Sequence, residues 1–366
     1  MDNANYDPPM LLDLASGGVF ASDPFMLVDV GCGLGLDPAW RRFGAALHAY
    51  GFDPQVEEIA RLAGEEENPN VHYYAAFVGL PGAPPPPLDD TYFDPFGRTS
   101  SVAAAARATA GGQTPFYETN DWPGQELTTE KVGLADFLRG HGVASVDFVK
   151  TDTDGDDLEV LRSLEDMIRP AGVLGFMVET PYIGSASDTV HTFHNVDRLL
   201  KKHGFLLTSI SVNRYSRAAL PAPFVYPILA QTVWGQPMQG DLVYLRDGAH
   251  PDYARFGELS PTKLLKLACL SELFLAPDCA AELLVAHREL LSPLVDVERL
   301  LDLLTPPLDG QSVSYREYLA AFEEDPTRFY PPPEPEPEPE FEPEPPPPPT
   351  LVQRTKHVVA RALLGR

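Results

Sequence analysis

The amino-acid sequence predicts an α/β fold in which helices cover both faces of a doubly wound parallel sheet. The first observation is that short apolar runs alternate with amphipathic helical patterns through the first two thirds of the 366 residues. The second is that these runs are apolar nearly throughout, as in strands that are buried on both faces. The third is that 44% of the residues are hydrophobic, which is enough for a sizeable core.

The expected strands are separated by stretches long enough to hold a helix. They are residues 25–30, 47–52, 71–78, 145–151, 173–179, 205–211 and 241–246. Helical patterns lie between several of them, at residues 38–46, 54–63, 133–142, 157–168 and 192–204. Such strand–helix alternation is typical of βαβ units.

Residues 80–132 interrupt this alternation, because they are rich in Pro, Gly and small residues and too long for an ordinary connection. We expect a partly ordered loop that contacts substrate, with plain disorder as the alternative. After about residue 250 the pattern becomes helical, which predicts a helical appendage at 251–330. The predicted division is therefore an N-terminal segment at 1–24, a sheet domain at 25–250 and this appendage.

Two further segments are predicted at the end of the chain. Residues 331–350 contain 12 Pro and 6 Glu, a composition that predicts an extended polyproline II linker. Residues 351–366 place apolar side chains at helical spacing with several Arg among them, which predicts a basic amphipathic helix. We expect this helix to contact an anionic membrane or a partner protein, and a solvated helix or a frayed end is the alternative.

The composition excludes several classes of function. The net charge of −26 disfavours nucleic acid as a partner, because an acidic protein repels phosphate backbones. The 3 Cys are too few for a disulfide framework or a zinc site, and we expect no metal. No basic region precedes an apolar one at the N-terminus, and no apolar run is long enough to span a bilayer. We therefore expect a cytoplasmic protein.

A glycine-rich loop follows the first expected strand. Asp29 lies near the end of that strand, and Gly31, Gly33 and Gly35 follow at alternate positions. Glycines at the carboxyl edge of a parallel sheet let a ligand lie against the main chain. The dinucleotide fingerprint G-x-G-x-x-G requires a glycine where this chain has Leu36. Asp29 suits a ligand that carries an ammonium and a sulfonium, and the alternative is a tight strand-to-helix turn.

A second acidic residue lies at the tip of the next expected strand. Asp53 follows Gly31 at the distance where dinucleotide and nucleoside sites place an acid that accepts hydrogen bonds from the ribose hydroxyls. Its alternative role is to cap a helix that begins at Pro54. The loop and the acid together favour a nucleoside ligand.

Residues 145–161, "SVDFVKTDTDGDDLEVL", carry a family resemblance. The pattern at Lys150, Asp152, Asp154, Gly155 and Asp157 resembles the FkbM-type family of S-adenosylmethionine-dependent methyltransferases. Pieces such as "GFDP", "FVG", "RTSSV" and "GDLVYLR" occur in the matching order, so the resemblance covers roughly residues 25–246. The chain departs from the family in having Asp154 where Glu is more frequent.

The resemblance implies a class I methyltransferase fold, a Rossmann-like sheet whose last strand is antiparallel. It also implies S-adenosylmethionine as the methyl donor and usually a hydroxyl group as the acceptor. Asp29 and the three glycines of the loop would then face the methionine part of the donor, and Asp53 would bind its ribose.

The catalytic candidates lie at the tips of the fourth and fifth strands and just beyond. A hydroxyl acceptor must lose a proton, which calls for a base. Asp152 is the first candidate and His191 the second, since a neutral imidazole is a competent base near pH 7. Asp152 has cofactor positioning as its alternative role, and His191 and His194 are alternatively ordinary surface or capping residues. A divalent ion shared by Asp152 and Glu179 is conceivable, although no spacing demands it.

The sequence therefore predicts a cytoplasmic S-adenosylmethionine-dependent methyltransferase that methylates a sugar or natural-product hydroxyl. The expected partner is a small-molecule or glycan acceptor. Two alternatives stay open. One is a catalytically silent ligand-binding module tethered by its tail, and the other is an NAD-dependent oxidoreductase, which Leu36 disfavours.

Overall fold

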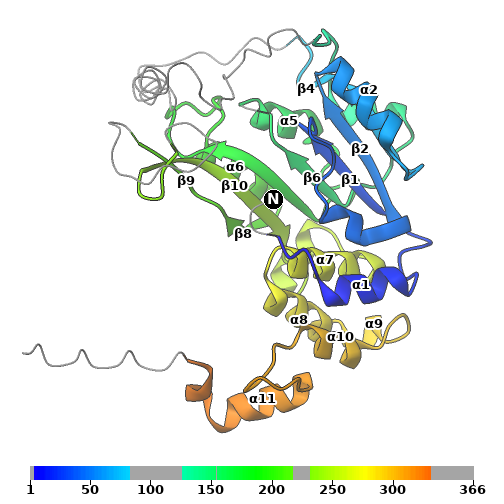
Figure 1. Ribbon diagram of the computed structural model, residues 1–366, viewed down its shortest axis with the longest axis vertical. Helices are drawn as coiled ribbons and strands as arrows, with labels where there is room; N and C mark the ends of the chain where they lie inside the picture. The colour runs from blue at the N-terminus through cyan, green and yellow to red at the C-terminus, as the bar shows by residue number, and fades with distance from the viewer. Residues whose placement is uncertain (1–3, 83–125, 154, 217–230, 331–366) are drawn as a thin grey trace, which may run out of the picture. The chain divides into compact units, whose positions relative to one another are not determined.

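The protein is described here by a computed structural model covering residues 4–82, 126–153, 155–216 and 231–330. Its centre is a sheet with the strand order β3-β2-β1-β6-β7-β10-β8, with β9 paired to β10 (Figure 1). The strands are β1 (Phe25–Val30), β2 (Leu47–Asp53), β3 (Val71–Ala75), β6 (Phe148–Thr151), β7 (Gly175–Pro181), β8 (Phe205–Ile210), β9 (Asn213–Tyr215) and β10 (Gln236–Arg246).

The strand directions confirm the predicted fold class. β1, β2, β3, β6 and β7 are parallel to one another, and the last strand, β10, is antiparallel to both β7 and β8. The chain builds the sheet outward from β1 in one direction and from β6 in the other, so the order reverses between β1 and β6. Ligands of open α/β sheets bind at the carboxyl ends of the strands beside such a reversal.

Four predicted helices form close to their expected positions. They are α2 (Val56–Glu65), α4 (Leu134–Gly140), α5 (Asp157–Leu164) and α6 (Phe193–Lys202). The helix expected at 38–46 is instead the 3-10 helix η1 (Trp40–Ala46), which is interrupted at Gly44, where φ is 58°. Its Phe43 ring stacks on Phe25 of β1 with the ring centroids 3.8 Å apart, so packing on the sheet decides its form.

The expected strand 71–78 is divided in two. Its first part is β3, and its second part is β4 (Phe77–Val78), which leaves the main sheet and pairs with β5 (Lys131–Val132) in a separate two-stranded sheet. β5 belongs to the stretch that was expected to be part of a long loop. The "RTSSV" motif and the rest of residues 83–125 lie outside the described residues.

Two apolar clusters lie on opposite faces of the sheet. Alternate residues of a strand point to opposite faces, and accordingly Leu27 belongs to one cluster and Val28 to the other. The first cluster contains residues of α1 (Pro9–Ser16), η1 and α7 (Pro261–Leu273), and the second contains residues of α4, α5 and α6. The sheet is thus covered on both faces, as predicted.

Helix α7 is joined to the sheet by a buried ionic cluster. The fully buried Nζ of Lys266 lies 3.0 Å from Oδ2 of Asp147 and 2.8 Å from Oδ1 of Asp23. The same Oδ2 accepts a hydrogen bond from the main-chain N–H of Met26 at 2.8 Å. Lys263 contacts the other oxygen, with its Nζ 2.6 Å from Oδ1 of Asp147.

The remaining helices lie on either side of α7 in the chain. They are η2 (Pro251–Phe256) just before it, and α8 (Pro277–Ala286), α9 (Arg288–Leu291), α10 (Val297–Leu304), α11 (Tyr315–Glu324) and η3 (Pro326–Phe329) after it. The described residues belong to two units, divided between Tyr318 and Leu319. The predicted linker at 331–350 and helix at 351–366 lie outside the described residues, and the predicted domain boundaries stay a prediction. Within the described ranges, no helix has the length and apolar composition that crossing a membrane requires.

Candidate functional site

Three sequence-predicted elements meet at the carboxyl edge of the sheet. The glycine loop follows β1, Asp152 follows β6, and Asp53 is the last residue of β2. β1 is hydrogen-bonded to both β2 and β6, so the three strand ends are adjacent at the point where the strand order reverses. The structure therefore brings the predicted donor-binding residues and the first catalytic candidate to one place.

A glycine is required at position 31 because the main chain of Asp152 passes close to it. Its φ is 83°, and a Cβ atom at this position would lie only 1.8 Å from the main-chain oxygen of Asp152. Its own N–H donates to the carbonyl of Phe52 on the neighbouring strand at 2.8 Å. The first glycine thus lets the end of β1 pass directly beside the end of β6.

Gly33 leaves bare main chain beside the second acid. A Cβ atom on Gly33 would lie 2.8 Å from Oδ2 of Asp53 and 3.0 Å from Nε2 of Gln55. Gly35, with φ at 85°, is in the left-handed region where glycine is favoured. The carboxylate of Asp53 therefore lies directly against the main chain at Gly33, where a side chain would collide with it.

Asp53 is buried, with 6% of its surface exposed. Its Oδ1 accepts a hydrogen bond from the main-chain N–H of Gln55 at 2.9 Å. Burial raises the pKa of Asp53 above its ordinary value, although hydrogen bonds from Gln55 and Gly33 oppose that shift. Helix α2 begins at Val56 with Gln55 as its N-cap residue, so Asp53 does not cap the helix in the way considered as its alternative role.

Gln55 is a site residue that sequence reasoning missed. It forms an isolated antiparallel bridge with Leu127, which belongs to a part of the chain far along the sequence. The bridge is supported by hydrogen bonds from Val56 N–H to the Glu126 carbonyl at 3.0 Å and from Thr128 N–H to the Pro54 carbonyl at 2.9 Å. This pairing joins residues that are distant in the sequence, so no local sequence pattern predicts it.

Asp29 has an internal cation beside it. Asp29 is 2% exposed, and β1 and β6 are in register so that it faces Lys150. The Nζ of Lys150 lies 3.1 Å from Oδ1 of Asp29 and donates to the carbonyl of Gly31 at 2.9 Å. Burial lowers the pKa of Lys150, but the charges of Asp29 and Asp152 outweigh burial and raise this pKa above its ordinary value. Lys150 is therefore charged, and it was recognised in the sequence only as part of the family motif.

Asp152 is the carboxylate of this group that reaches solvent. Its side chain is 46% exposed, and its Oδ2 lies 3.4 Å from Nζ of Lys150. Its main-chain N–H donates to the carbonyl of Val30 at 3.0 Å, which fixes the start of the loop after β6. Asp154, two residues further on, lies outside the described residues.

His191 lies in the loop between β7 and α6 and contacts the loop after β6. Its Nδ1 is 2.9 Å from the carbonyl oxygen of Gly155 and 3.8 Å from Oδ2 of Asp157, and its side chain is 10% exposed. Asp157 is fully buried and accepts a hydrogen bond from Oγ1 of Thr153 at 3.0 Å. Burial raises the pKa of Asp157, and His191 opposes this shift. In a neutral His191, Nδ1 must carry the proton to donate to the Gly155 carbonyl, so Nε2 is the basic nitrogen.

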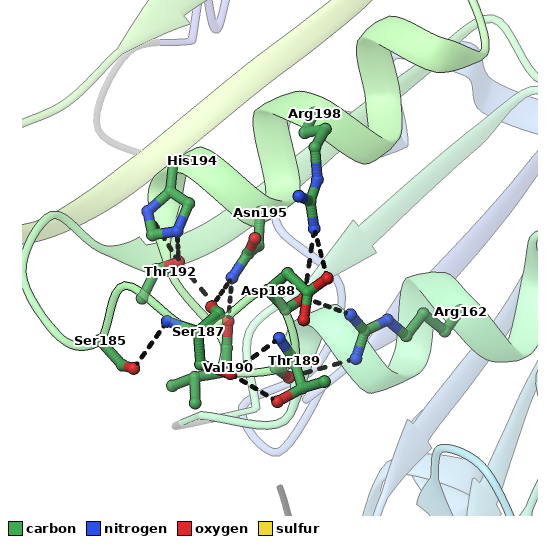
Figure 2. Close-up of polar contacts among 10 residues, drawn as sticks. All are labelled: Arg162, Ser185, Ser187, Asp188, Thr189, Val190, Thr192, His194, Asn195 and Arg198. Carbon is green, nitrogen blue, oxygen red and sulfur yellow. Dashed lines mark hydrogen bonds and ion pairs between the residues drawn. The ribbon is translucent and has the colours of Figure 1, made fainter. Parts of the chain in front are cut away.

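The loop that carries His191 is held by side chains of two helices (Figure 2). Nδ2 of Asn195, on α6, donates to main-chain oxygens of the loop at 2.7 and 2.8 Å. Arg162, on α5, donates to the carbonyls of Asp188 and Thr189 at 2.9 and 3.2 Å. Nδ1 of His194 lies 3.1 Å from Oγ1 of Thr192, the N-cap residue of α6.

Glu179 lies on β7, where its Oε1 accepts a hydrogen bond from Nε2 of Gln239 on β10 at 3.0 Å. Among the residues that the structure describes, no group of three or more His, Cys, Asp and Glu side chains is arranged to hold a metal ion. The conceivable divalent ion between Asp152 and Glu179 stays a hypothesis.

The family comparison agrees with the predicted resemblance. Residues 84–207 match the family model described as the methyltransferase FkbM domain. The predicted resemblance to FkbM-type methyltransferases is thus confirmed over this part of the chain, which includes β6, α5, β7 and α6. Among curated proteins, no sequence matches the chain.

Solved structures of methyltransferases are similar to the chain at low identity. Magnesium protoporphyrin IX methyltransferase from Synechocystis, with S-adenosylmethionine bound, is 12% identical, with 66% of this chain and 80% of that chain covered and a TM-score of 0.26. A precorrin-6y C5,15-methyltransferase from Geobacter metallireducens is 8% identical over 64% and 87%, with a TM-score of 0.29. The N-terminal domain of EvdMO1, with S-adenosylhomocysteine bound, is 14% identical over 66% and 82%, with a TM-score of 0.27. The assignment of the fold rests on the strand order and directions given above.

Proposed function

We propose that this chain is a methyltransferase that uses S-adenosylmethionine to methylate a hydroxyl group of a sugar or another small natural product. The observation that carries the proposal is the convergence of the glycine loop, the buried Asp53 and the exposed Asp152 at the reversal point of the sheet. The match to the methyltransferase FkbM domain supports the same reaction class.

The donor-binding residues fit the parts of S-adenosylmethionine. A carboxylate has about four acceptor positions, and hydrogen bonds from Gln55 and Gly33 occupy part of those on Asp53, so a ribose hydroxyl would bind at the remainder. Gly33 has no side chain, so the carboxylate of Asp53 can lie directly against the main chain of the loop, which supports one ligand contacting both. Beside Gly31, the carboxylates of Asp29 and Asp152 outnumber the single charge of Lys150, so the site suits a cationic donor.

Methyl transfer depends mainly on the alignment of the acceptor oxygen with the methyl group. S-adenosylmethionine supplies a methyl group that is already activated by the positive sulfur. The protein has to hold the acceptor oxygen in line with that carbon, and such orientation accounts for much of the acceleration in displacement reactions.

A hydroxyl acceptor must also lose its proton as the new O–C bond forms and the S–C bond breaks. Asp152 is exposed and adjacent to the glycine loop, which supports its carboxylate as the group that accepts that proton and releases it to solvent. His191 is the second candidate, with Nε2 as its basic nitrogen. His191 lies against the loop after β6, and this position favours Asp152 over His191 as the proton acceptor.

Calorimetry and turnover test this proposal. We expect S-adenosylmethionine and S-adenosylhomocysteine to bind, NAD not to bind, and S-adenosylhomocysteine to accumulate when a suitable hydroxyl acceptor is added. Asp53→Ala should weaken binding of the donor by about 30-fold or more, because hydrogen bonds to a charged group contribute about 1.5–3 kcal/mol each.

The matched control for this variant is Asp136→Ala, since Asp136 is an exposed carboxylate on α4 outside the site. Binding of NAD in place of S-adenosylmethionine would overturn the proposal. Donor binding without turnover on any hydroxyl acceptor would favour a silent binding module.

A further inference from the structure

Lys150 joins the two sides of the candidate site through a single ammonium group. Its Nζ donates to the carbonyl of Gly31 at 2.9 Å and lies 3.1 Å from Asp29 and 3.4 Å from Asp152. The Gly31 carbonyl accepts a hydrogen bond, and the two carboxylates lie within ion-pair distance, so the ammonium contacts three oxygens. Gly31 and Asp29 belong to the β1 side of the reversal point, and Asp152 belongs to the β6 side.

A buried lysine at this position is not explained by stability. The Lys150 side chain is 13% exposed and its partner Asp29 is nearly fully buried. Replacing a buried ion pair by apolar side chains is often neutral or stabilising, because removing two charges from water is unfavourable. The ion pair with Asp29 offsets the unfavourable removal of the Lys150 charge from water. The carboxylate of Asp152 stays exposed, so its contact with Lys150 buries no further charge.

We propose that Lys150 is a positioning residue, which holds the carboxylate of Asp152 and the carbonyl of Gly31 in a fixed relation across the reversal point. This inference rests on the proposed function, in which Asp152 accepts the proton and the loop at Gly31 holds the donor. Lys150 thereby keeps the proton acceptor aligned with the donor loop.

Lys150 also supplies the nearest positive charge to Asp152. The other titratable groups that face Lys150 are Asp29 on β1, Cys32 in the glycine loop and Asp53 at the end of β2. Removing Lys150 takes away the cation that contacts both the carboxylate of Asp152 and the carbonyl of Gly31, so the two sides of the reversal point should lose their fixed relation.

The test compares two variants that differ only at position 150. Lys150→Met alone leaves the buried carboxylate of Asp29 without a partner, which is expected to destabilise the fold strongly. The pair is therefore Asp29→Asn as the reference and Asp29→Asn/Lys150→Met as the test. Each is checked by thermal unfolding and by calorimetry with S-adenosylhomocysteine before its turnover is measured.

Relative to the reference, we expect the double variant to keep its affinity for S-adenosylhomocysteine within about threefold, while kcat falls by about 10- to 100-fold. Asp29→Asn/Lys150→Arg should recover part of kcat, because Arg restores a cation. Lys202→Met is the matched lysine control, since Lys202 is exposed and pairs with Glu165 on the outer surface, and it should behave as the wild type.

Two failures are distinguishable. A wild-type protein that neither binds S-adenosylhomocysteine nor turns over would overturn the proposed function and this inference with it. A functional wild type, together with a double variant whose kcat equals that of Asp29→Asn, would overturn the positioning role of Lys150 alone.

Discussion

Replacement of single glycines provides a sharp test of how the glycine loop is built. Gly31, Gly35 and Gly18 all have φ between 70° and 85°, so an alanine at any of them meets the same backbone strain. They differ in what the added Cβ would meet. It would lie 1.8 Å from a main-chain oxygen at Gly31 and 3.2 Å from a Leu62 methyl at Gly35, and at Gly18 there is nothing within 4 Å.

The magnitudes follow from these distances. The left-handed conformation costs an alanine about 1–2 kcal/mol, and this is the whole expected effect of Gly18→Ala. Real Cβ atoms stay at least 3.0 Å from other atoms, so at Gly31 the loop or the Asp152 carbonyl must move by more than about 1 Å. Overpacking of this kind adds about 1–3 kcal/mol, for a total of about 2–5 kcal/mol at Gly31. The Leu62 methyl can adjust, so Gly35→Ala should lie between the two.

Urea unfolding and calorimetry measure the two consequences separately. We expect the free energy of unfolding to fall in the order Gly18→Ala, Gly35→Ala, Gly31→Ala, with the largest loss last. Gly31→Ala should also weaken S-adenosylhomocysteine binding by at least about 10-fold, because it displaces the loop relative to Asp152, whereas Gly18→Ala should bind as the wild type does. Equal destabilisation by all three variants would show that strain alone matters and would refute the argument from close approach.

Three further predictions concern buried polar groups. Burial raises the pKa of Asp53 in the folded protein, so the contribution of Asp53 to stability is present at low pH and is lost as pH rises through that pKa. Urea unfolding at pH 7 should therefore find Asp53→Asn more stable than the wild type. Asp53→Asn should nevertheless bind S-adenosylhomocysteine more weakly. Asp147→Ala leaves the ammonium of Lys266 buried with one carboxylate partner fewer, so it should lower the free energy of unfolding by about 3–5 kcal/mol. A loss below about 1 kcal/mol would show that α7 is held by apolar packing alone. Asn195→Ala removes two hydrogen bonds that hold the loop carrying His191, and it should lower thermal stability with little change in donor affinity. An equal loss of thermal stability and of donor affinity would contradict the separation of this loop from the donor site.

The sheet could be predicted because its signals are local. Each buried strand is a short apolar run, and the positions of β1, β2 and β8 follow from the sequence within a residue or two. The division of the third strand could not be predicted, because β4 leaves the sheet to pair with β5, which follows a long and irregular stretch. The form of η1 depends on Gly44 and on rings packed against the sheet, which are features of the tertiary structure.

The candidate site divides in the same way. The glycine loop and Asp53 could be predicted because each directly follows or ends a strand, and the carboxyl ends of parallel strands meet at one edge. Gln55 could not, because its position depends on a bridge with Leu127. The pairing of Asp29 with Lys150 also could not, because it depends on the register between strands that are distant in the sequence.

The most direct test of the central claim is a crystal structure of the protein with S-adenosylhomocysteine bound. The account predicts that the nucleoside lies against the main chain at Gly33, with its ribose hydroxyls on the carboxylate of Asp53 and the sulfur facing Asp152. A ligand bound elsewhere on the protein, or a ribose that makes no contact with Asp53, would contradict it.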